Sequence, residues 1–250
     1  MDPATLPYCG APPLPGAAGW NLDPVLLAAL LLALPVLWRG ARPGGRGLVL
    51  GGWAVLALAL VSPLCSLSVA LFSARVAQHL LIVLVAAPLL AAGWRDAVRP
   101  PGAAGLLGSA GAFALALWTW HLPLPYAATF ASTPAYWAMH LTLLASAAWL
   151  WRGLWQGASS RPELAFAAGI GTAAQSGLLG AMLTLAPRPL FAPHAGTTLP
   201  WGLTPLEDQQ LGGLLMWVPG GLAFAVLAVA AAAALLRPIA HDPVGRAPRP

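Results

Sequence analysis

The chain has 250 residues, of which 59% are hydrophobic and only 8% are charged. Soluble globular domains carry about 25% charged residues, so this composition excludes a water-soluble domain and predicts an integral membrane protein. The net charge of +5 comes from arginines without any lysine, and no basic cluster with interleaved aromatic residues points to nucleic-acid binding. Arginine without lysine, with abundant Ala, Gly and Pro, is typical of a GC-rich bacterial genome and favours a bacterial plasma membrane.

Seven apolar segments predict an all-α fold, a polytopic bundle of seven transmembrane helices. In chain order they are residues 22–38, 47–61, 74–92, 105–121, 135–155, 164–186 and 209–236. Most of these runs are long enough to cross a hydrocarbon core of about 30 Å as a helix. Connections rich in Gly and Pro separate them, as expected where helices end.

The placement of arginine predicts the orientation of this bundle. With seven helices, ten of the twelve arginines fall on one side, and only Arg75 and Arg188 fall on the other. Because arginine gathers in cytoplasmic loops, the N-terminus is predicted to be outside and the C-terminus cytoplasmic. Residues 1–21 are then a periplasmic Pro-rich tail that does not read as a signal peptide, residues 22–236 the membrane domain, and residues 237–250 a cytoplasmic tail.

Two local patterns predict how the helices pack and bend. The sixth segment has a small residue at every fourth position: Gly169, Ala173, Gly177 and Ala181. Such a stripe favours close approach of a second helix. Pro35, Pro88 and Pro219 are predicted to kink the first, third and seventh helices, since proline lacks the N–H group that the helix ladder needs.

Three histidines are predicted to share one depth near the periplasmic ends of three successive helices. They are His79, His121 and His140. With a rise of 1.5 Å per residue, a position five residues from a helix end lies roughly 8 Å below the surface. Ionisable residues inside membrane segments are costly and often functional. One histidine at a helix end is more often an interfacial hydrogen-bonding group, but three at one level favour a metal site.

Sulfur-containing residues are predicted near the same level: Cys9, Cys65, Met182 and Met216. Imidazole, thiolate and thioether groups suit copper, Cu(I) above all, whereas the carboxylate cages preferred by calcium or magnesium are missing. The sequence therefore predicts a periplasmic copper site built from the three histidines and these sulfur groups. Methionines also serve as packing residues. The two cysteines either form a disulfide in an oxidising compartment, or bind the metal, or alternate between these two states.

Asp208, at the start of the last helix, has three interpretations. An acidic group at a helix N-terminus interacts favourably with the helix dipole, so capping is one. The carboxylate could instead orient a ligand histidine, or pair with Arg75 or Arg188. His194, in the preceding loop, is predicted to be solvated.

Several short motifs follow one another from the second segment to the seventh. They are Ser62-Pro63-Leu64-Cys65, Leu71 to Arg75, Gln78-His79-Leu80-Leu81, Trp120-His121-Leu122-Pro123, Trp137 with His140, and Asp208-Gln209-Gln210-Leu211 with Met216 to Gly221. Together they resemble the CtaG family of cytochrome c oxidase assembly factors. The resemblance implies a multi-helix bacterial inner-membrane protein that is needed to build active haem-copper oxidase and has a part in copper handling.

The predicted function is that of a non-enzymatic assembly factor of the respiratory chain, a metallochaperone that passes copper to an oxidase subunit. Its expected partners are cytochrome c oxidase subunits and the lipid bilayer, with periplasmic copper chaperones and a second copy of the chain as further candidates. A haem-binding electron-transfer protein is an alternative, because two of the same histidines could serve as axial ligands. A copper permease is another, but the inner halves of the predicted helices hold no His, Cys or acidic residue.

Overall fold

A computed structural model describes residues 6–94 and 102–235, and within these ranges the chain is helical with no β-strand. The predicted all-α fold is therefore confirmed. The predicted C-terminal tail, residues 237–250, lies outside the described residues.

Each predicted apolar segment coincides with one helix or with one continuous run of helical pieces. The α-helices are α1 (Pro24–Gly40), α2 (Arg46–Val61), α3 (Leu64–Ala70), α4 (Phe72–Leu80), α5 (Ala87–Gly93), α6 (Ala103–Trp120), α7 (Pro123–Ala131), α8 (Thr133–Ser160), α9 (Pro162–Thr184), α10 (Pro205–Leu215) and α11 (Gly221–Leu235). The π turns are η2 (Leu81–Ala86) and η5 (Met216–Gly220), and the 3-10 turns are η3 (Ala192–His194) and η4 (Leu199–Trp201). The largest difference at a segment end is five residues, because α8 ends at residue 160 and not at 155.

Three helices are long and apolar enough to cross a membrane by themselves: Phe72–Gly93, Ala103–Trp120 and Pro162–Thr184. A fourth span results if α2 and α3, which are bent by 47° at their junction, are counted as one. The number of seven spans and the direction of the chain across the membrane therefore stay predictions.

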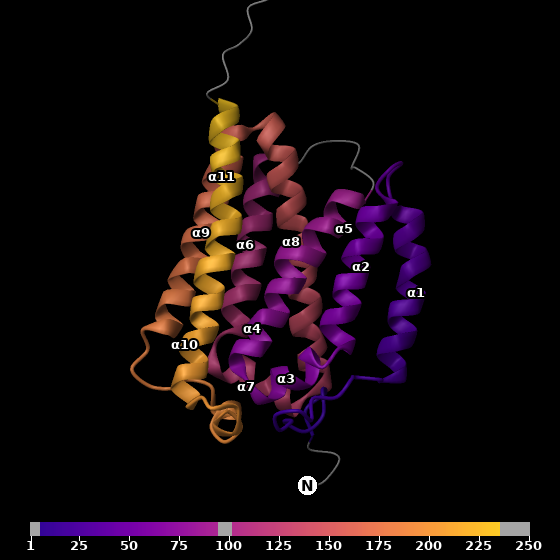
Figure 1. The fold of residues 1–250 in the computed structure, drawn as a ribbon. Helices are drawn as coiled ribbons and strands as arrows, with labels where there is room; N and C mark the ends of the chain where they lie inside the picture. Colours follow the sequence, from indigo (N-terminus) through magenta and orange to yellow (C-terminus); the bar gives the residue numbers. More distant parts are fainter. Residues whose placement is uncertain (1–5, 95–101, 236–250) are drawn as a thin grey trace, which may run out of the picture.

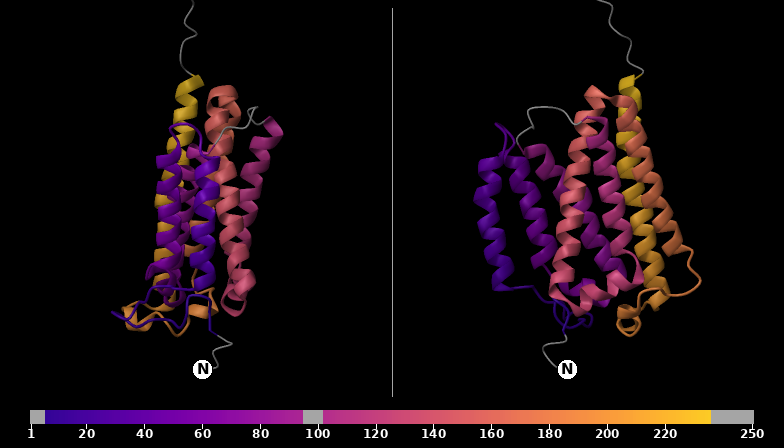
Figure 2. Two further views of the ribbon diagram at one scale, coloured as in Figure 1. Left: turned by 90° about the vertical axis from the view of Figure 1, so that its right-hand side faces the viewer. Right: turned by 180° about the vertical axis from the view of Figure 1, so that it is seen from behind.

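The long helices run side by side in one bundle, with α1 at one edge and α9 and α11 near the other (Figure 1). Figure 2 shows the same bundle from two further sides. In all views the N-terminal segment 6–23, α3, α7 and the loop 185–204 gather at one end of the bundle. We call this the disulfide end, after the Cys9–Cys65 bond within it.

Two of the three prolines predicted to kink helices lie at π turns, whereas Pro35 lies inside α1. Neither Pro88 nor Pro219 can donate a backbone hydrogen bond to the preceding turn, and the chain forms η2 just before the first and η5 around the second. Phe72–Gly93 nevertheless counts as one continuous helix of 22 residues. The Val83 carbonyl in η2 accepts a 2.8 Å hydrogen bond from Trp151 Nε1 of α8, which helps to hold this turn in place. π turns inside α-helices are frequent at functional sites.

The sixth and seventh segments approach each other closely at small residues. A Cβ atom on Gly180 of α9 would lie 2.9 Å from the Gly213 carbonyl oxygen of α10 and 2.9 Å from the Trp217 backbone nitrogen. Gly177, a member of the predicted stripe, leaves ordinary space, with Trp217 Cδ1 at 3.6 Å. Small residues in the sixth segment thus permit close packing, as predicted, and the contact at Gly180 is tighter than the one at Gly177.

Candidate metal centre

The three predicted histidines come together inside the bundle near its disulfide end. His79 lies in the last turn of α4, His121 is the residue that ends α6, and His140 lies in the second turn of α8. All three side chains are buried. The His79 ring centroid is 5.4 Å from that of His140 and 5.9 Å from that of His121. The shared depth predicted from the sequence thus corresponds to a real cluster of imidazoles.

The spacing of these rings suits ligands of a common metal ion. With metal–nitrogen bonds of about 2 Å, two imidazoles on one ion have ring centres at most about 6 Å apart. Both pairs that include His79 fall within this limit. Among the residues that the structure describes, however, no three His, Cys, Asp or Glu side chains converge tightly enough to hold an ion as they stand. Binding would therefore require the rings to turn toward one another.

Hydrogen bonds set which nitrogen atoms are available in this histidine cluster. His121 Nδ1 lies 2.7 Å from the Leu117 carbonyl oxygen, and His140 Nδ1 lies 3.0 Å from the Tyr136 carbonyl oxygen. Because a carbonyl only accepts, each Nδ1 carries the proton and each Nε2 keeps its lone pair in the neutral ring. His140 Nε2 and both nitrogens of His79 are buried without a hydrogen-bond partner. Such buried polar atoms are uncommon, and a bound ion is one explanation for them.

A small cavity of about 30 Å³ adjoins two of the histidines. His79, His121, Ser176 and Met216 contribute to its wall, and the other lining residues are mostly apolar. Both π turns reach it, because Val83 and Leu84 of η2 and Met216 of η5 also line it. Met216 thus lines the same cavity as His79 and His121, near the level at which the sequence predicted it.

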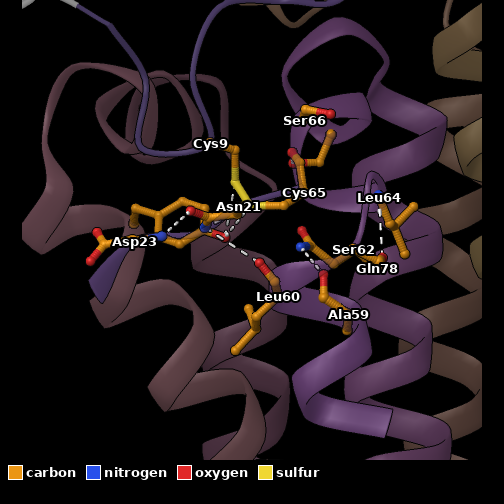
Figure 3. Close-up of a disulfide and its surroundings, with 12 residues drawn as sticks. Cys9, Asn21, Asp23, Ala59, Leu60, Ser62, Leu64, Cys65, Ser66 and Gln78 are labelled. Atoms are coloured by element: carbon orange, nitrogen blue, oxygen red, sulfur yellow. Dashed lines mark hydrogen bonds between the residues drawn. A yellow bond between two sulfur atoms is a disulfide. The ribbon is translucent and has the colours of Figure 1, made fainter. Parts of the chain in front are cut away.

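The predicted sulfur residues differ in where the structure places them. Cys9 and Cys65 form a disulfide, with Cα atoms 5.5 Å apart, that joins the N-terminal segment to α3 (Figure 3). Of the alternatives left by the sequence, the structure thus contains the disulfide, and in this form neither sulfur is a thiolate ligand. Met182 is 53% exposed and does not line the cavity beside His79 and His121.

Asp208 caps the N-terminus of the helix that carries His79. Its carboxylate accepts hydrogen bonds from the Phe72 backbone N–H at 2.6 Å, the Ser73 backbone N–H at 3.1 Å and the Ser73 hydroxyl at 2.5 Å. The sequence predicted capping of the last helix, whereas these hydrogen bonds cap α4. These contacts go to the backbone and to Ser73, so Asp208 affects His79 through the position of α4.

Arg75 and His194 form a second buried cluster beside the first. The Arg75 guanidinium donates to Thr129 Oγ1 at 2.7 Å and to the Ser68 carbonyl oxygen at 3.2 Å, and it lies 4.2 Å from the Phe130 ring centroid. His194 Nε2 shares a 2.6 Å hydrogen bond with the Tyr126 hydroxyl, and the side chain is only 2% exposed. The prediction that His194 is solvated was wrong, because its loop folds back onto α7.

Acid is expected to destabilise the protein through His194. Burial, together with the charge of nearby Arg75, lowers the pKa of His194 to about 3, whereas an unfolded histidine titrates near 6.5. Between these values the unfolded chain binds a proton that the folded chain does not. The stability contributed by neutral His194 is therefore complete above pH 6.5 and falls below it, by up to about 1.4 kcal/mol per pH unit.

Thermal unfolding of the detergent-solubilised protein between pH 7.5 and 4.5 measures this effect. The variant His194→Gln cannot titrate at this position, so its unfolding midpoint should fall less steeply with acid than that of the wild type. Parallel curves for the two proteins would contradict the assignment.

Two residues beside the histidine cluster were missed by the sequence analysis. Tyr136 is buried, and its ring centroid lies 4.2 Å from that of His140. Its position four residues before His140, one helical turn away, was a signal that could have identified it. Ser176 lines the cavity from α9, and no pattern in the sequence distinguishes it from other small polar residues in the helices.

Comparison with known proteins supplies independent information. A family model described as cytochrome c oxidase caa3 assembly factor (Caa3_CtaG) matches residues 28–238. The match includes all three clustered histidines, Met216 and Asp208, and it begins after Cys9. No curated protein and no solved structure matches the chain significantly.

Proposed function

Because this chain belongs to the family of cytochrome c oxidase caa3 assembly factors, we propose that it supports oxidase assembly by holding copper and passing it on. The ion is Cu(I), held by His79, His121 and His140 with the Met216 thioether nearby. The receiving partner is an oxidase subunit that approaches the disulfide end of the bundle, which is the periplasmic face in the predicted orientation.

The observation that carries this proposal is the set of buried imidazoles with free lone pairs. Both nitrogens of His79 and Nε2 of His140 have no hydrogen-bond partner, although leaving such groups unpaired costs about 1–3 kcal/mol each. Imidazole and thioether are neutral ligands that suit Cu(I), and a monovalent ion is the least costly metal charge to place in an apolar cavity.

The size of the cavity favours a single ion over a haem group. A cavity of about 30 Å³ has room for a small group of atoms only. A porphyrin would require α4, α6 and α8 to move apart, whereas copper requires only that the imidazole rings turn. Haem ligation by two of these histidines therefore has less support than copper binding.

An anaerobic titration with Cu(I) against a competing chelator tests the metal site. The full chain, purified in detergent, is expected to bind one Cu(I). His79→Ala should weaken binding by more than about 100-fold, because even the loss of a residue that only orients a ligand costs about 10–100-fold. His194→Gln is the matched control, since His194 is buried outside the cluster, and it should bind as the wild type does. Equal affinity in His79→Ala would reject the site.

The assembly role needs a separate test in cells. A strain that lacks this gene should contain oxidase with reduced copper and reduced activity. The wild-type gene and His194→Gln should restore both, whereas His79→Ala should not. Restoration by His79→Ala would separate the assembly function from the histidine cluster.

A further inference from the structure

One side chain, Tyr136, connects the disulfide with the histidine cluster. The Tyr136 hydroxyl is 3.4 Å from Cys9 Sγ and 3.6 Å from Cys65 Sγ, and the Tyr136 ring packs on His140 with centroids 4.2 Å apart. His140 in turn lies 5.4 Å from His79, centroid to centroid. A continuous series of contacts therefore runs from both sulfur atoms to the centre of the cluster.

The two cysteines of this bond have different environments. Cys65 is completely buried in α3, where Asn21 Nδ2 lies 3.5 Å from its sulfur (Figure 3). Cys9 is only partly buried, in the N-terminal segment at the surface of the disulfide end. In thiol–disulfide exchange, an external thiolate attacks the sulfur that it can reach. Cys9 is thus the less buried of the two cysteines and the one on which exchange would begin, whereas Cys65 lies in the protein interior.

The disulfide is not the only attachment of the N-terminal segment among the described residues, because hydrogen bonds also hold this segment on the bundle. The Asn21 backbone N–H donates to the Val61 carbonyl at 2.8 Å, and Ser66 Oγ donates to the Gly19 carbonyl at 3.2 Å. Trp201 Nε1 donates to the Pro13 carbonyl at 3.2 Å. These bonds hold the segment on α2, on α3 and on the loop before α10.

We propose that Cys9 and Cys65 form a redox pair that, as a dithiol, reduces Cu(II) arriving at the histidine cluster. This inference rests on the proposed function and adds a reaction to it. Two thiols give two electrons and two protons: two Cu(II) become two Cu(I), one S–S bond forms, and both protons leave to water. The electrons pass singly, from the sulfur pair across Tyr136 to His140, to one copper ion after another.

The dithiol is regenerated by an external dithiol of the thioredoxin-like class. Its thiolate attacks Cys9 Sγ, the bond to Cys65 breaks, and the second thiol of the partner resolves the mixed disulfide. The partner leaves as a disulfide and this chain returns to two thiols, so atoms and electrons balance. The pair is then a stoichiometric reductant of two electrons per chain, renewed by exchange.

The test begins with the full chain in detergent, reduced by a phosphine that is then removed without oxygen. Addition of Cu(II) with a colorimetric Cu(I) chelator should yield two Cu(I) and consume two thiols per chain.

Free thiols also react with copper directly, so the informative variant is His79→Ala combined with His140→Ala, which keeps both cysteines. Its rate of thiol loss should be at least 10-fold lower. Tyr136→Phe removes the hydroxyl between the sulfurs and His140, and it should slow the reaction several-fold.

Matched variants separate the possible outcomes. Tyr8→Phe removes a hydroxyl from a ring whose centroid lies 4.7 Å from that of Tyr136, and it should react at the wild-type rate. An unchanged rate in the double histidine variant, or thiols that persist in the presence of Cu(II), would overturn the proposal. If Cys9→Ser with Cys65→Ser still binds Cu(I) normally while the wild-type thiols do not react, only the redox inference fails. If the wild type binds no Cu(I), the proposed function fails as well.

Discussion

Asp208→Ala is expected to destabilise the protein by about 3 kcal/mol or more, because it removes three buried hydrogen bonds to the first turn of α4. The backbone N–H groups of Phe72 and Ser73 would lose their partner at a helix end, where no carbonyl of the same helix can replace it. For a chain of this length the loss corresponds to a decrease of about 6–12 °C in the unfolding midpoint. Thermal unfolding in detergent measures it.

Glu207, the neighbouring acid, provides the control. Glu207 belongs to the capping box of its own helix α10, where its carboxylate bonds to exposed Thr204. Removing an exposed cap costs only about 1 kcal/mol, so Glu207→Ala should lower the midpoint much less. If both alanine variants lowered the midpoint equally, the contact of Asp208 with α4 would not be the reason for the effect.

Gly213→Ala is expected to be the other strongly destabilising single change. The added methyl group would lie 2.7 Å from the Gly180 carbonyl oxygen and 2.7 Å from the Thr184 backbone nitrogen, and it would also clash with Thr184 Oγ1. Backbone atoms cannot rotate out of the way, so α9 and α10 would have to separate. Overpacking of this kind costs about 1–3 kcal/mol, and the effect should again appear as a lower unfolding midpoint.

Gly171 and Gly177 of α9 provide controls, because alanine is expected to be tolerated at both positions. A Cβ atom on Gly171 would meet nothing within 4 Å, and alanine favours helix over glycine by up to about 1 kcal/mol. Gly171→Ala should therefore leave stability unchanged or raise it. Gly177→Ala should be tolerated as well, although Gly177 belongs to the small-residue stripe in the sequence. Destabilisation by Gly177→Ala but not by Gly213→Ala would mean that the stripe, and not the observed contact, brings the helices together.

The sequence predicted the helical segments well because long apolar runs dominate it. The prediction of three histidines at one depth also rested on simple counting along those runs, and the rings indeed lie together. What it could not reveal are contacts between distant parts of the chain. Asp208 and Phe72 are separated by 136 positions, and no local pattern indicates that one caps the helix begun by the other.

The error at His194 has a physical cause, which is that local position does not determine burial. His194 lies in a loop and was expected in water, yet aromatic rings of α7 pack against it, with the Phe130 centroid at 5.4 Å. Packing against another helix decided the outcome at this position.

The bond between Cys9 and Cys65 also makes a closed covalent ring of the chain that includes α1 and α2. α1 is the outermost helix of the bundle (Figure 1), and a groove between it and α2 is lined by Leu27, Leu31, Trp53 and Leu58. While the disulfide is intact, α1 is held at both ends within this ring. Separation of α1 from α2 along the groove would therefore leave α1 joined to α3 through the disulfide at one end and to α2 through the chain at the other.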